Sequence, residues 1–337
     1  MEKVAVIGGG QMGSQIAALS AMSGHETSIF DNNKEYLDSK LVFTRENIEN
    51  LVSKDLINKE SLDNFNQNLK VYDSLETVVD DKTFVIEAVV ERFDVKKDIF
   101  ATISNILDED VVLATNSSFI AASEIAQHCK HPERFINMHF FYPPLRMDLI
   151  EISFPESTSK EVVDRTKELS KLMGRTVVTL NKETPGFIVN RMLGALVDEA
   201  YELYDEGIAD FKDIDMAIKK GLNHPLGPFE LTDYSGLDIS YYSKLKIYNE
   251  TKNPKDKPKK FLEEKVKDGK LGVKTGEGFY NYDKPSKSWS LRLKKNSLSA
   301  LIFKIILSDW ISKGYGLFQY FWDRSLIFFK ASSPVIS

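Results

Sequence analysis

Residues 4–13 read Val4-Ala5-Val6-Ile7-Gly8-Gly9-Gly10-Gln11-Met12-Gly13, an apolar run that leads into a glycine-rich segment. A helix-like stretch follows, and the next apolar run ends in Ile29-Phe30-Asp31. We interpret this order as a strand, a glycine turn, a helix and a second strand closed by an acid. A glycine motif alone is weak evidence, but this is the setting that the dinucleotide-binding fingerprint requires.

The glycines of the turn have different expected roles. Gly8 would allow the tight turn, Gly10 would let the backbone approach a pyrophosphate, and Gly13 would let the helix pack close to the sheet. Asp31 would bond the adenosine ribose, although its alternative role is only to begin a turn. Because Asn32 rather than Arg follows it, NAD is favoured over NADP. The cofactor-binding residues predicted from this segment are Gly8, Gly10, Gln11, Met12, Gly13 and Asp31.

Composition is that of an ordinary globular protein. The chain has 337 residues, a formal net charge of -6 and 42% hydrophobic residues, which argues against a nucleic-acid partner. Cys129 is its single cysteine, so an intramolecular disulfide is excluded and a reducing compartment fits. The first strand follows Met1 almost directly, with no leader pattern, and we therefore expect a cytoplasmic protein.

Strand and helix signals alternate over the first half of the chain. Apolar spacing from Leu37 to Leu51 and a polar helical stretch at 59–68 suggest a helical arm at about 34–68. The alternation predicts an α/β fold, a Rossmann-type doubly wound sheet with parallel strands and helical crossovers. After Thr184-Pro185-Gly186 the patterns are helical. We predict a dinucleotide-binding domain at 1–183, a C-terminal all-helical domain at 184–284 and a tail at 285–337.

Ligands of such sheets lie at the carboxyl ends of the strands, and this rule selects candidate residues. Among five histidines, only His139 ends an apolar strand on that side. An imidazole there can accept the proton of an alcohol, and Glu151, on the next strand, is the nearest candidate to orient it. From spacing alone, a structural histidine remains the alternative. No metal-ligand spacing occurs, and Ser117 lacks the nucleophile-elbow glycines, so we interpret it as a hydrogen-bond donor.

Together the motifs resemble those of the L-3-hydroxyacyl-CoA dehydrogenases, especially the bacterial 3-hydroxybutyryl-CoA dehydrogenases. The resemblance runs from Lys3 to about Tyr282, and it rests on the order and spacing of many short motifs. Besides the glycine turn and Glu151 they are Glu87-Ala88-Val89-Val90-Glu91, Asn116-Ser117-Ser118, His139-Phe140-Phe141, Pro185-Gly186-Phe187-Ile188-Val189-Asn190-Arg191, Gly227-Pro228-Phe229-Glu230-Leu231 and Lys274-Thr275-Gly276-Glu277-Gly278-Phe279-Tyr280.

The resemblance implies a function and a set of roles. The reaction would be the NAD-linked oxidation of a 3-hydroxyacyl-CoA, or its reverse, in fatty acid or butyrate metabolism. By carry-over, His139 is the general base with Glu151 as its partner, and Ser117 and Asn190 bind the reacting oxygen. The same carry-over gives Glu91 and Lys96 cofactor contacts near the nicotinamide and gives the helical domain a homodimer interface. The family contacts CoA with the helical arm, where Lys40 and Lys54 are candidates, and a solvated surface lysine is the alternative for each.

Two departures from the family pattern lie beside the expected reacting centre. Tyr142 stands where Asn is usual after His-Phe-Phe, and Thr115-Asn116 stands where Asn-Thr is usual. A dehydrogenase of a free 3-hydroxy acid, such as carnitine or gulonate, is therefore an alternative. A non-catalytic dinucleotide-binding sensor or scaffold is another.

The tail at 285–337 does not resemble the family. It has the pattern of an amphipathic helix followed by aromatic residues, interrupted by charges, so no transmembrane span is expected. A membrane-surface or partner contact and a disordered or out-of-frame extension are the open alternatives.

Overall fold

The computed structural model describes residues 1–282, so the tail predicted at 285–337 lies outside the described residues. The chain forms two compact units, of which the first is Met1–Val189 and the second begins at Asn190. Segment 184–189, which the sequence assigned to the helical domain, therefore belongs to the first unit.

An eight-stranded sheet forms the centre of the first unit, in the order β3-β2-β1-β4-β5-β6-β7-β8. Every pair of neighbouring strands is parallel except β6 and β7. The strand order reverses direction between β1 and β4, which confirms the Rossmann-type fold. The strands are β1 (Lys3–Ile7), β2 (Glu26–Phe30), β3 (Leu69–Val71), β4 (Phe84–Glu87), β5 (Val112–Thr115), β6 (Phe135–Phe140), β7 (Leu149–Ser153) and β8 (Thr176–Thr179).

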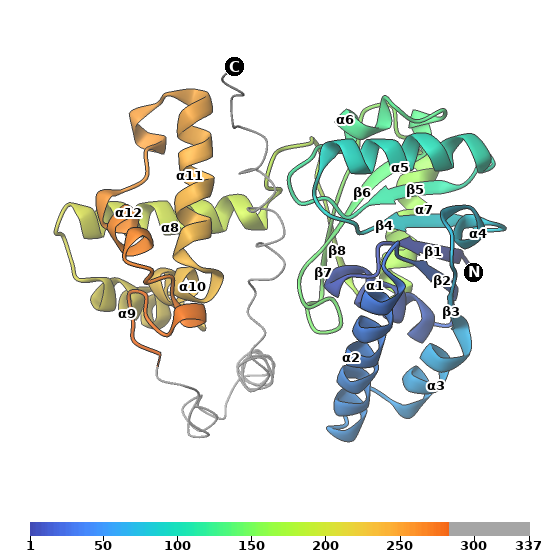
Figure 1. The fold of residues 1–337 in the computed structure, drawn as a ribbon, viewed down its shortest axis with the longest axis horizontal. Coiled ribbons are helices and arrows are strands. Elements are labelled where there is room, and N and C mark those ends of the chain that lie inside the picture. The colour runs from blue at the N-terminus through green and yellow to red at the C-terminus, as the bar shows by residue number, and fades with distance from the viewer. Residues whose placement is uncertain (283–337) are drawn as a thin grey trace, which may run out of the picture. The chain divides into compact units, whose positions relative to one another are not determined.

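Helices cover the sheet, and α2 and α3 form the expected arm, a pair that packs beside α1 (Figure 1). Both arm helices begin with an asparagine whose side chain accepts a backbone N–H, Asn33 for α2 and Asn58 for α3. The helices of this unit are α1 (Gln11–Met22), α2 (Lys34–Ser53), α3 (Lys59–Asn68), α4 (Leu75–Val79), α5 (Phe93–Ile106), α6 (Ala122–Ala126) and α7 (Lys160–Leu172), with a 3-10 turn at Pro132–Arg134.

The glycine turn between β1 and α1 is as compact as its sequence predicts. Gly8 has φ of 101°, a left-handed conformation that glycine adopts without strain. A Cβ atom built on Gly13 would lie 1.8 Å from the carbonyl oxygen of Gly8, so any side chain would push α1 away from the turn. A Cβ atom on Gly10 would meet nothing within 4 Å, which leaves open space on that side of the turn.

Strand β7 reverses the direction of the sheet, which the alternation of strands and helices did not predict. The connection 141–148 carries no helix and is too short for the crossover that a parallel neighbour needs. β7 therefore pairs antiparallel with β6, and His139 lies directly opposite Glu151 in the register.

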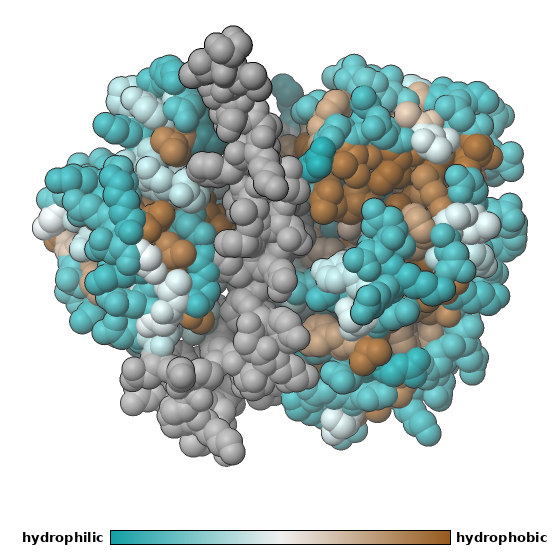
Figure 2. All heavy atoms as spheres, in the orientation of Figure 1, coloured by the Kyte–Doolittle hydropathy of each residue, from teal (hydrophilic) through white to brown (hydrophobic). Residues whose placement is uncertain are grey.

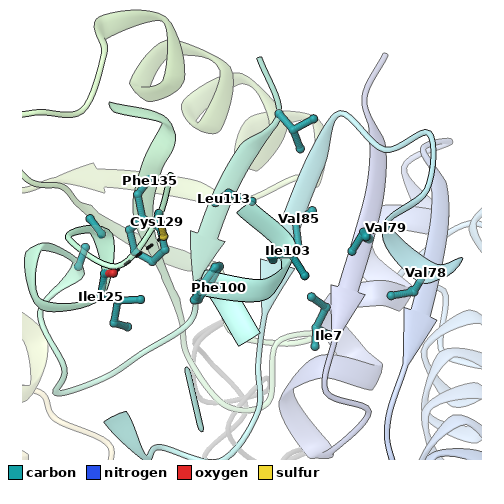
Figure 3. Close-up of a cluster of buried hydrophobic side chains, with 14 residues drawn as sticks. Ile7, Val78, Val79, Val85, Phe100, Ile103, Leu113, Ile125, Cys129 and Phe135 are labelled. Atoms are coloured by element: carbon teal, nitrogen blue, oxygen red, sulfur yellow. Dashed lines mark hydrogen bonds between the residues drawn. The ribbon is translucent and has the colours of Figure 1, made fainter. Parts of the chain in front are cut away.

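A hydrophobic cluster fills the space between the sheet and helices α4, α5 and α6 (Figure 3). Ala5 and Ile7 of β1 face this cluster, and Val4 and Val6, which alternate with them, are also buried, so both faces of the sheet are covered. Cys129 is part of the cluster, and burial raises the pKa of its thiol to about 12. This cysteine is therefore a packing residue with little nucleophilic character.

The described part of the second unit is helical. Its core surrounds Tyr201 and Phe229, which are almost fully buried among aromatic neighbours. The helices are α8 (Val189–Asp205), α9 (Phe211–Gly221), α10 (Pro228–Ser235), α11 (Leu237–Thr251) and α12 (Lys260–Lys267), with 3-10 turns at Pro254–Asp256 and Val273–Thr275.

Two buried aspartates explain the glycine-containing motifs of this unit. Asp215 accepts the N–H groups of Phe229 and Glu230 at the start of α10, and Asp233 accepts those of Phe279 and Tyr280. Burial raises the pKa of both carboxyl groups. A Cβ atom on Gly227 would lie 2.3 Å from Asp215, and one on Gly278 would lie 2.1 Å from Asp233. These motifs are therefore required for packing.

We expect Gly13→Ala and Gly10→Ala to differ in stability, because only Gly13 is closely packed in the turn. Gly13→Ala should lower the free energy of unfolding by about 2–3 kcal/mol, because its methyl group overlaps the Gly8 carbonyl. Gly10→Ala should stay within about 0.5 kcal/mol of the parent, since its methyl group enters open space. Urea unfolding of both variants measures the difference, and equal losses would contradict this account.

Candidate functional site

The structure brings His139 and Glu151 into direct contact. The Nδ1 atom of His139 lies 3.1 Å from Oε2 of Glu151, and both side chains are buried, with Glu151 fully inaccessible. The contact follows from the antiparallel register, because residues directly opposite each other present their side chains on the same face. Glu151 engages Nδ1, and Nε2 is therefore the ring nitrogen left for a ligand.

The second carboxylate oxygen of Glu151 binds the backbone at the start of α8. Oε1 accepts the N–H groups of Ile188 and Val189, both at 3.0 Å. These donors are the first residue of α8 and the residue before it, at a helix N-terminus, where N–H groups lack partners within the helix and a negative charge is favourable. The buried carboxylate thus has hydrogen-bond donors on both oxygens, as an ionised buried group requires.

Two aromatic rings enclose the imidazole of His139. The ring of Phe187 is stacked on it, with centroids 4.6 Å apart and an interplanar angle of 18°. The ring of Phe141 is tilted by 56° at 4.7 Å. Phe187 has φ of 53°, a left-handed conformation that is rare for a bulky residue.

A second buried ionic cluster lies where β4 ends. Lys96 of α5 donates to both oxygens of Glu87, at 2.6 Å and 2.8 Å, and its side chain is 1% exposed. Glu87 also accepts the hydroxyl of Thr115, its partner in the register, and the N–H of Val89. A buried lysine remains charged only when it is paired in this way.

Glu91 continues the cluster toward the end of β5. Its Oε2 lies 3.3 Å from Nζ of Lys96, and its Oε1 accepts the hydroxyl of Ser117 at 2.5 Å. The same oxygen accepts the N–H groups of Ser118 and Phe119, both at 2.9 Å. Three predicted site residues, Glu91, Lys96 and Ser117, are therefore parts of one network.

Two asparagines join the ends of β5 and β6. Asn116 accepts the N–H of Phe140 at 2.9 Å, and Asn137 donates its side-chain amide to the carbonyl of Ser117 at 3.0 Å. The first bond links the backbone next to Ser117 with the residue after His139. These contacts fix Ser117 and His139 as neighbours at the carboxyl edge of the sheet.

The glycine turn has the features of a dinucleotide site. Asp31 accepts the N–H of Gly9 at 2.7 Å and that of Asn33 at 2.9 Å, so its carboxylate lies beside the turn. Gly10 borders open space, and Oε1 of Gln11 is buried without a partner. Met12 packs in the core at the start of α1. This combination of open backbone, acid and helix N-terminus fits a pyrophosphate and an adjoining ribose.

The remaining predicted residue, Asn190, is half-buried near the start of α8 and is the first residue of the second unit. The other histidines are His25, whose pKa is lowered by burial, His128, His131 and His224. Within residues 1–282 we find no group of three or more potential ligands that could hold a metal ion. No helix in that range is long and apolar enough to cross a membrane.

Three residues that shape the site stand in the sequence motifs but have no predicted role of their own. Glu87 anchors Lys96, Thr115 binds Glu87, and Phe187 covers His139. An acid at the end of the apolar run 84–86 was a usable signal for Glu87, because a charge entering a buried strand needs a partner. Nothing in the sequence indicates where the ring of Phe187 points.

Apolar side chains are exposed beside this network. Figure 2 shows hydrophobic residues gathered on the visible face of the first unit, within a largely hydrophilic surface. Near the ends of β4 and β5, three hydrophobic residues are exposed, namely Val90, Phe93 and Phe119, with 43%, 39% and 53% of their surface accessible. Polar groups convergent beside apolar surface are typical of a ligand site.

Comparison with known families covers both units. Residues 3–184 match the 3-hydroxyacyl-CoA dehydrogenase NAD-binding domain, and residues 186–282 match the 3-hydroxyacyl-CoA dehydrogenase C-terminal domain. The 3-hydroxybutyryl-CoA dehydrogenase of Clostridioides difficile is 36% identical over 282 residues, which is 84% of this chain and all of that protein. The mitochondrial hydroxyacyl-coenzyme A dehydrogenase of Homo sapiens is 34% identical over 84% of this chain and 91% of its own.

Solved structures agree with these relatives. The (S)-3-hydroxybutyryl-CoA dehydrogenase of Ralstonia eutropha has a TM-score of 0.77 at 33% identity, over 84% of this chain and 100% of its own. A diketoreductase, described with dicarbonyl compounds, has a TM-score of 0.73 at 30% identity, over 84% of this chain and 99% of its own.

We expect Asp31→Asn to reduce the preference for NAD over NADP by about tenfold or more. The amide oxygen still accepts the N–H of Gly9, so the turn is kept, while the bond from the N–H of Asn33 is lost and the charge that opposes a 2′-phosphate is removed. Fluorescence titration with both cofactors measures the ratio of dissociation constants. An unchanged ratio would show that Asp31 serves only the turn.

Proposed function

This chain belongs to the 3-hydroxyacyl-CoA dehydrogenase family of NAD-dependent oxidoreductases, and we propose that it oxidises an L-3-hydroxyacyl-CoA, such as 3-hydroxybutyryl-CoA, to the 3-oxoacyl-CoA, or catalyses the reverse. The observation that carries this proposal is the buried contact between His139 and Glu151. An alcohol can lose hydride only if its proton is removed, and an imidazole held by a carboxylate is a suitable acceptor.

In the forward direction, Nε2 of His139 takes the proton of the 3-hydroxyl group. Glu151 holds Nδ1–H and stabilises the imidazolium that results, while the N–H groups of Ile188 and Val189 keep the carboxylate in place. Bound NAD supplies the hydride acceptor. Its holders are the glycine turn with Gln11 and Met12, Asp31 at the ribose, and Glu91 and Lys96 toward the nicotinamide.

Ser117 and Asn190 complete the proposal as ligands of the reacting oxygen. The Ser117 hydroxyl donates its proton to Glu91 and accepts the N–H of Ile120 at 2.9 Å. One lone pair of this hydroxyl therefore remains, but the single proton of the substrate alcohol goes to Nε2 of His139, so Ser117 would bind the reacting oxygen as a donor. Donation to a developing alkoxide would require Ser117 to release Glu91. Asn190 is proposed from the family motif.

A free 3-hydroxy acid is the second candidate substrate. The departure at Tyr142 favours it, because this residue lies close to His139 along the chain. The diketoreductase of related structure shows that this fold also accompanies other carbonyl substrates. We further propose a homodimer formed by the helical unit and a cytoplasmic location, to which the low cysteine content of the chain, with Cys129 alone, is suited.

Glu151→Gln is expected to lower kcat by about 10²–10⁴ with little change in stability. Because Ile188 and Val189 present N–H groups, the new amide oxygen faces them and its NH₂ group faces Nδ1 of His139. This arrangement places the imidazole proton on Nε2, where it blocks the base. Steady-state kinetics with acetoacetyl-CoA and NADH, together with thermal unfolding, measure both effects.

The matched control is Glu133→Gln. His131 and Glu133 form a contact of the same 3.1 Å length, but it is partly exposed and lies before β6. We expect its kcat to equal that of the parent. A Glu151→Gln enzyme as active as this control would refute the proposed role of Glu151 as the partner of His139. Binding of NADH by the parent protein without turnover of any thioester or free acid would favour a non-catalytic dinucleotide-binding protein.

The two substrate classes are separated by one comparison. We expect kcat/KM for acetoacetyl-CoA to exceed that for free acetoacetate and other free 3-oxo acids by at least about 10³, since binding energy from CoA contributes to the transition state. Parallel assays of the thioesters and the free acids, at fixed NADH concentration, measure the ratio. Negligible thioester turnover alongside conversion of a free acid would select the second candidate.

A further inference from the structure

Phe187 has an unusual backbone conformation for its residue type. Five non-glycine residues of the described chain have positive φ, and the other four are Asp55, Asp81, Asn223 and Lys252. Those four are polar, and aspartate and asparagine tolerate the left-handed region through local hydrogen bonds. Phe187 has no such bond to offer and is only 4% exposed. Strained backbone of this kind persists where the surrounding structure enforces it, often at functional sites.

The left-handed turn directs three groups toward the pair formed by His139 and Glu151. Gly186 and Phe187 have φ of 77° and 53° in succession. The ring of Phe187 stacks on the imidazole, and the next two N–H groups, of Ile188 and Val189, both reach Oε1 of Glu151. An extended backbone at Phe187 would change the direction of the ring relative to the N–H groups that follow it.

Different contacts of His139 restrict different motions of its ring. The bond from Nδ1 to Glu151 fixes one ring atom but leaves the plane of the imidazole able to rock about that atom. The Phe187 ring, only 18° from parallel, fixes the plane. Phe141, tilted by 56°, restricts the same ring with an inclined surface. With one atom and the plane fixed, the direction of Nε2 is defined.

We propose that Phe187 is a positioning residue, whose left-handed backbone holds its ring flat on His139 and thereby aims Nε2 at the substrate hydroxyl. This inference rests on the proposed function of His139 as the base. The Pro185-Gly186-Phe187 turn would then orient the base, in addition to its role in packing.

Three substitutions of Phe187 distinguish the effect of the flat ring from the effects of apolar bulk and of backbone strain. Phe187→Asn suits the left-handed region but has no ring, so we expect a folded protein. Phe187→Leu keeps apolar bulk and the same backbone strain without a flat surface. Phe187→Tyr keeps the ring. We expect kcat to fall about tenfold or more in the Asn and Leu variants, with KM for NAD within about twofold of the parent, and to recover in the Tyr variant.

Proton NMR gives a readout independent of turnover. The Nδ1–H of His139, bonded to a buried carboxylate, should give a slowly exchanging downfield signal, identified by its loss in His139→Gln. We expect the signal to persist in Phe187→Tyr and to broaden through exchange in Phe187→Asn and Phe187→Leu, at unchanged NAD affinity.

The proposal is overturned if either ring-free variant keeps both kcat and the sharp signal, or if Phe187→Leu restores what Phe187→Asn loses, because bulk would then suffice. Should Phe187→Asn fail to fold, the comparison of Leu with Tyr decides. Failure of the base itself is distinguishable: His139→Gln would then retain turnover, whatever the Phe187 variants do. Loss of turnover in His139→Gln with normal Phe187 variants rejects only the positioning role.

Discussion

A buried carboxylate must find hydrogen-bond donors within the protein, and Glu151 imposes this constraint on the first unit. An uncompensated buried charge costs several kcal/mol, so each oxygen of Glu151 requires partners. One oxygen takes the imidazole of His139, which lies directly opposite Glu151 in the register of β6 and β7. The other takes the N–H groups of Ile188 and Val189. The left-handed conformation of Phe187, which costs about 1–2 kcal/mol, is offset by these charge-assisted bonds, worth about 1.5–3 kcal/mol each.

The same constraint organises the neighbouring strands. Glu87 is fully buried and is compensated by Lys96, Thr115 and the N–H of Val89. Lys96 also forms an ion pair with Glu91. Glu91 in turn accepts the hydroxyl of Ser117 and the N–H groups of the two residues that follow it. Buried polar networks of this kind are rigid only when every member is satisfied. The carboxyl edge of the sheet is thus held by ionic contacts that also fix the residues proposed to meet cofactor and substrate.

Much of this architecture could be predicted from the sequence because it depends on local patterns. The glycine turn, the alternation of strands and helices and the rule of strand ends together indicate the Rossmann-type fold and place His139 on the ligand side. The reversal of β7 was not predictable from alternation, since strand direction depends on the length of the connection 141–148. The burial of Glu87 depends on its contact with Lys96 in the following helix, α5. The stacking of a ring on His139 depends on the positive φ angle of Phe187, which no local propensity favours.

The residues that depart from the family pattern differ in what they contact. Thr115 is fully buried and bonds Glu87, while Asn116 is 4% exposed and bonds the N–H of Phe140. Both side chains therefore serve the scaffold that holds Ser117 beside His139, and their exchange of order leaves that scaffold satisfied. Tyr142 is different, because it is half-buried in the connection 141–148, directly after Phe141, whose ring touches His139. A change of substrate would consequently act through Tyr142, where a phenol replaces a small amide, rather than through the end of β5.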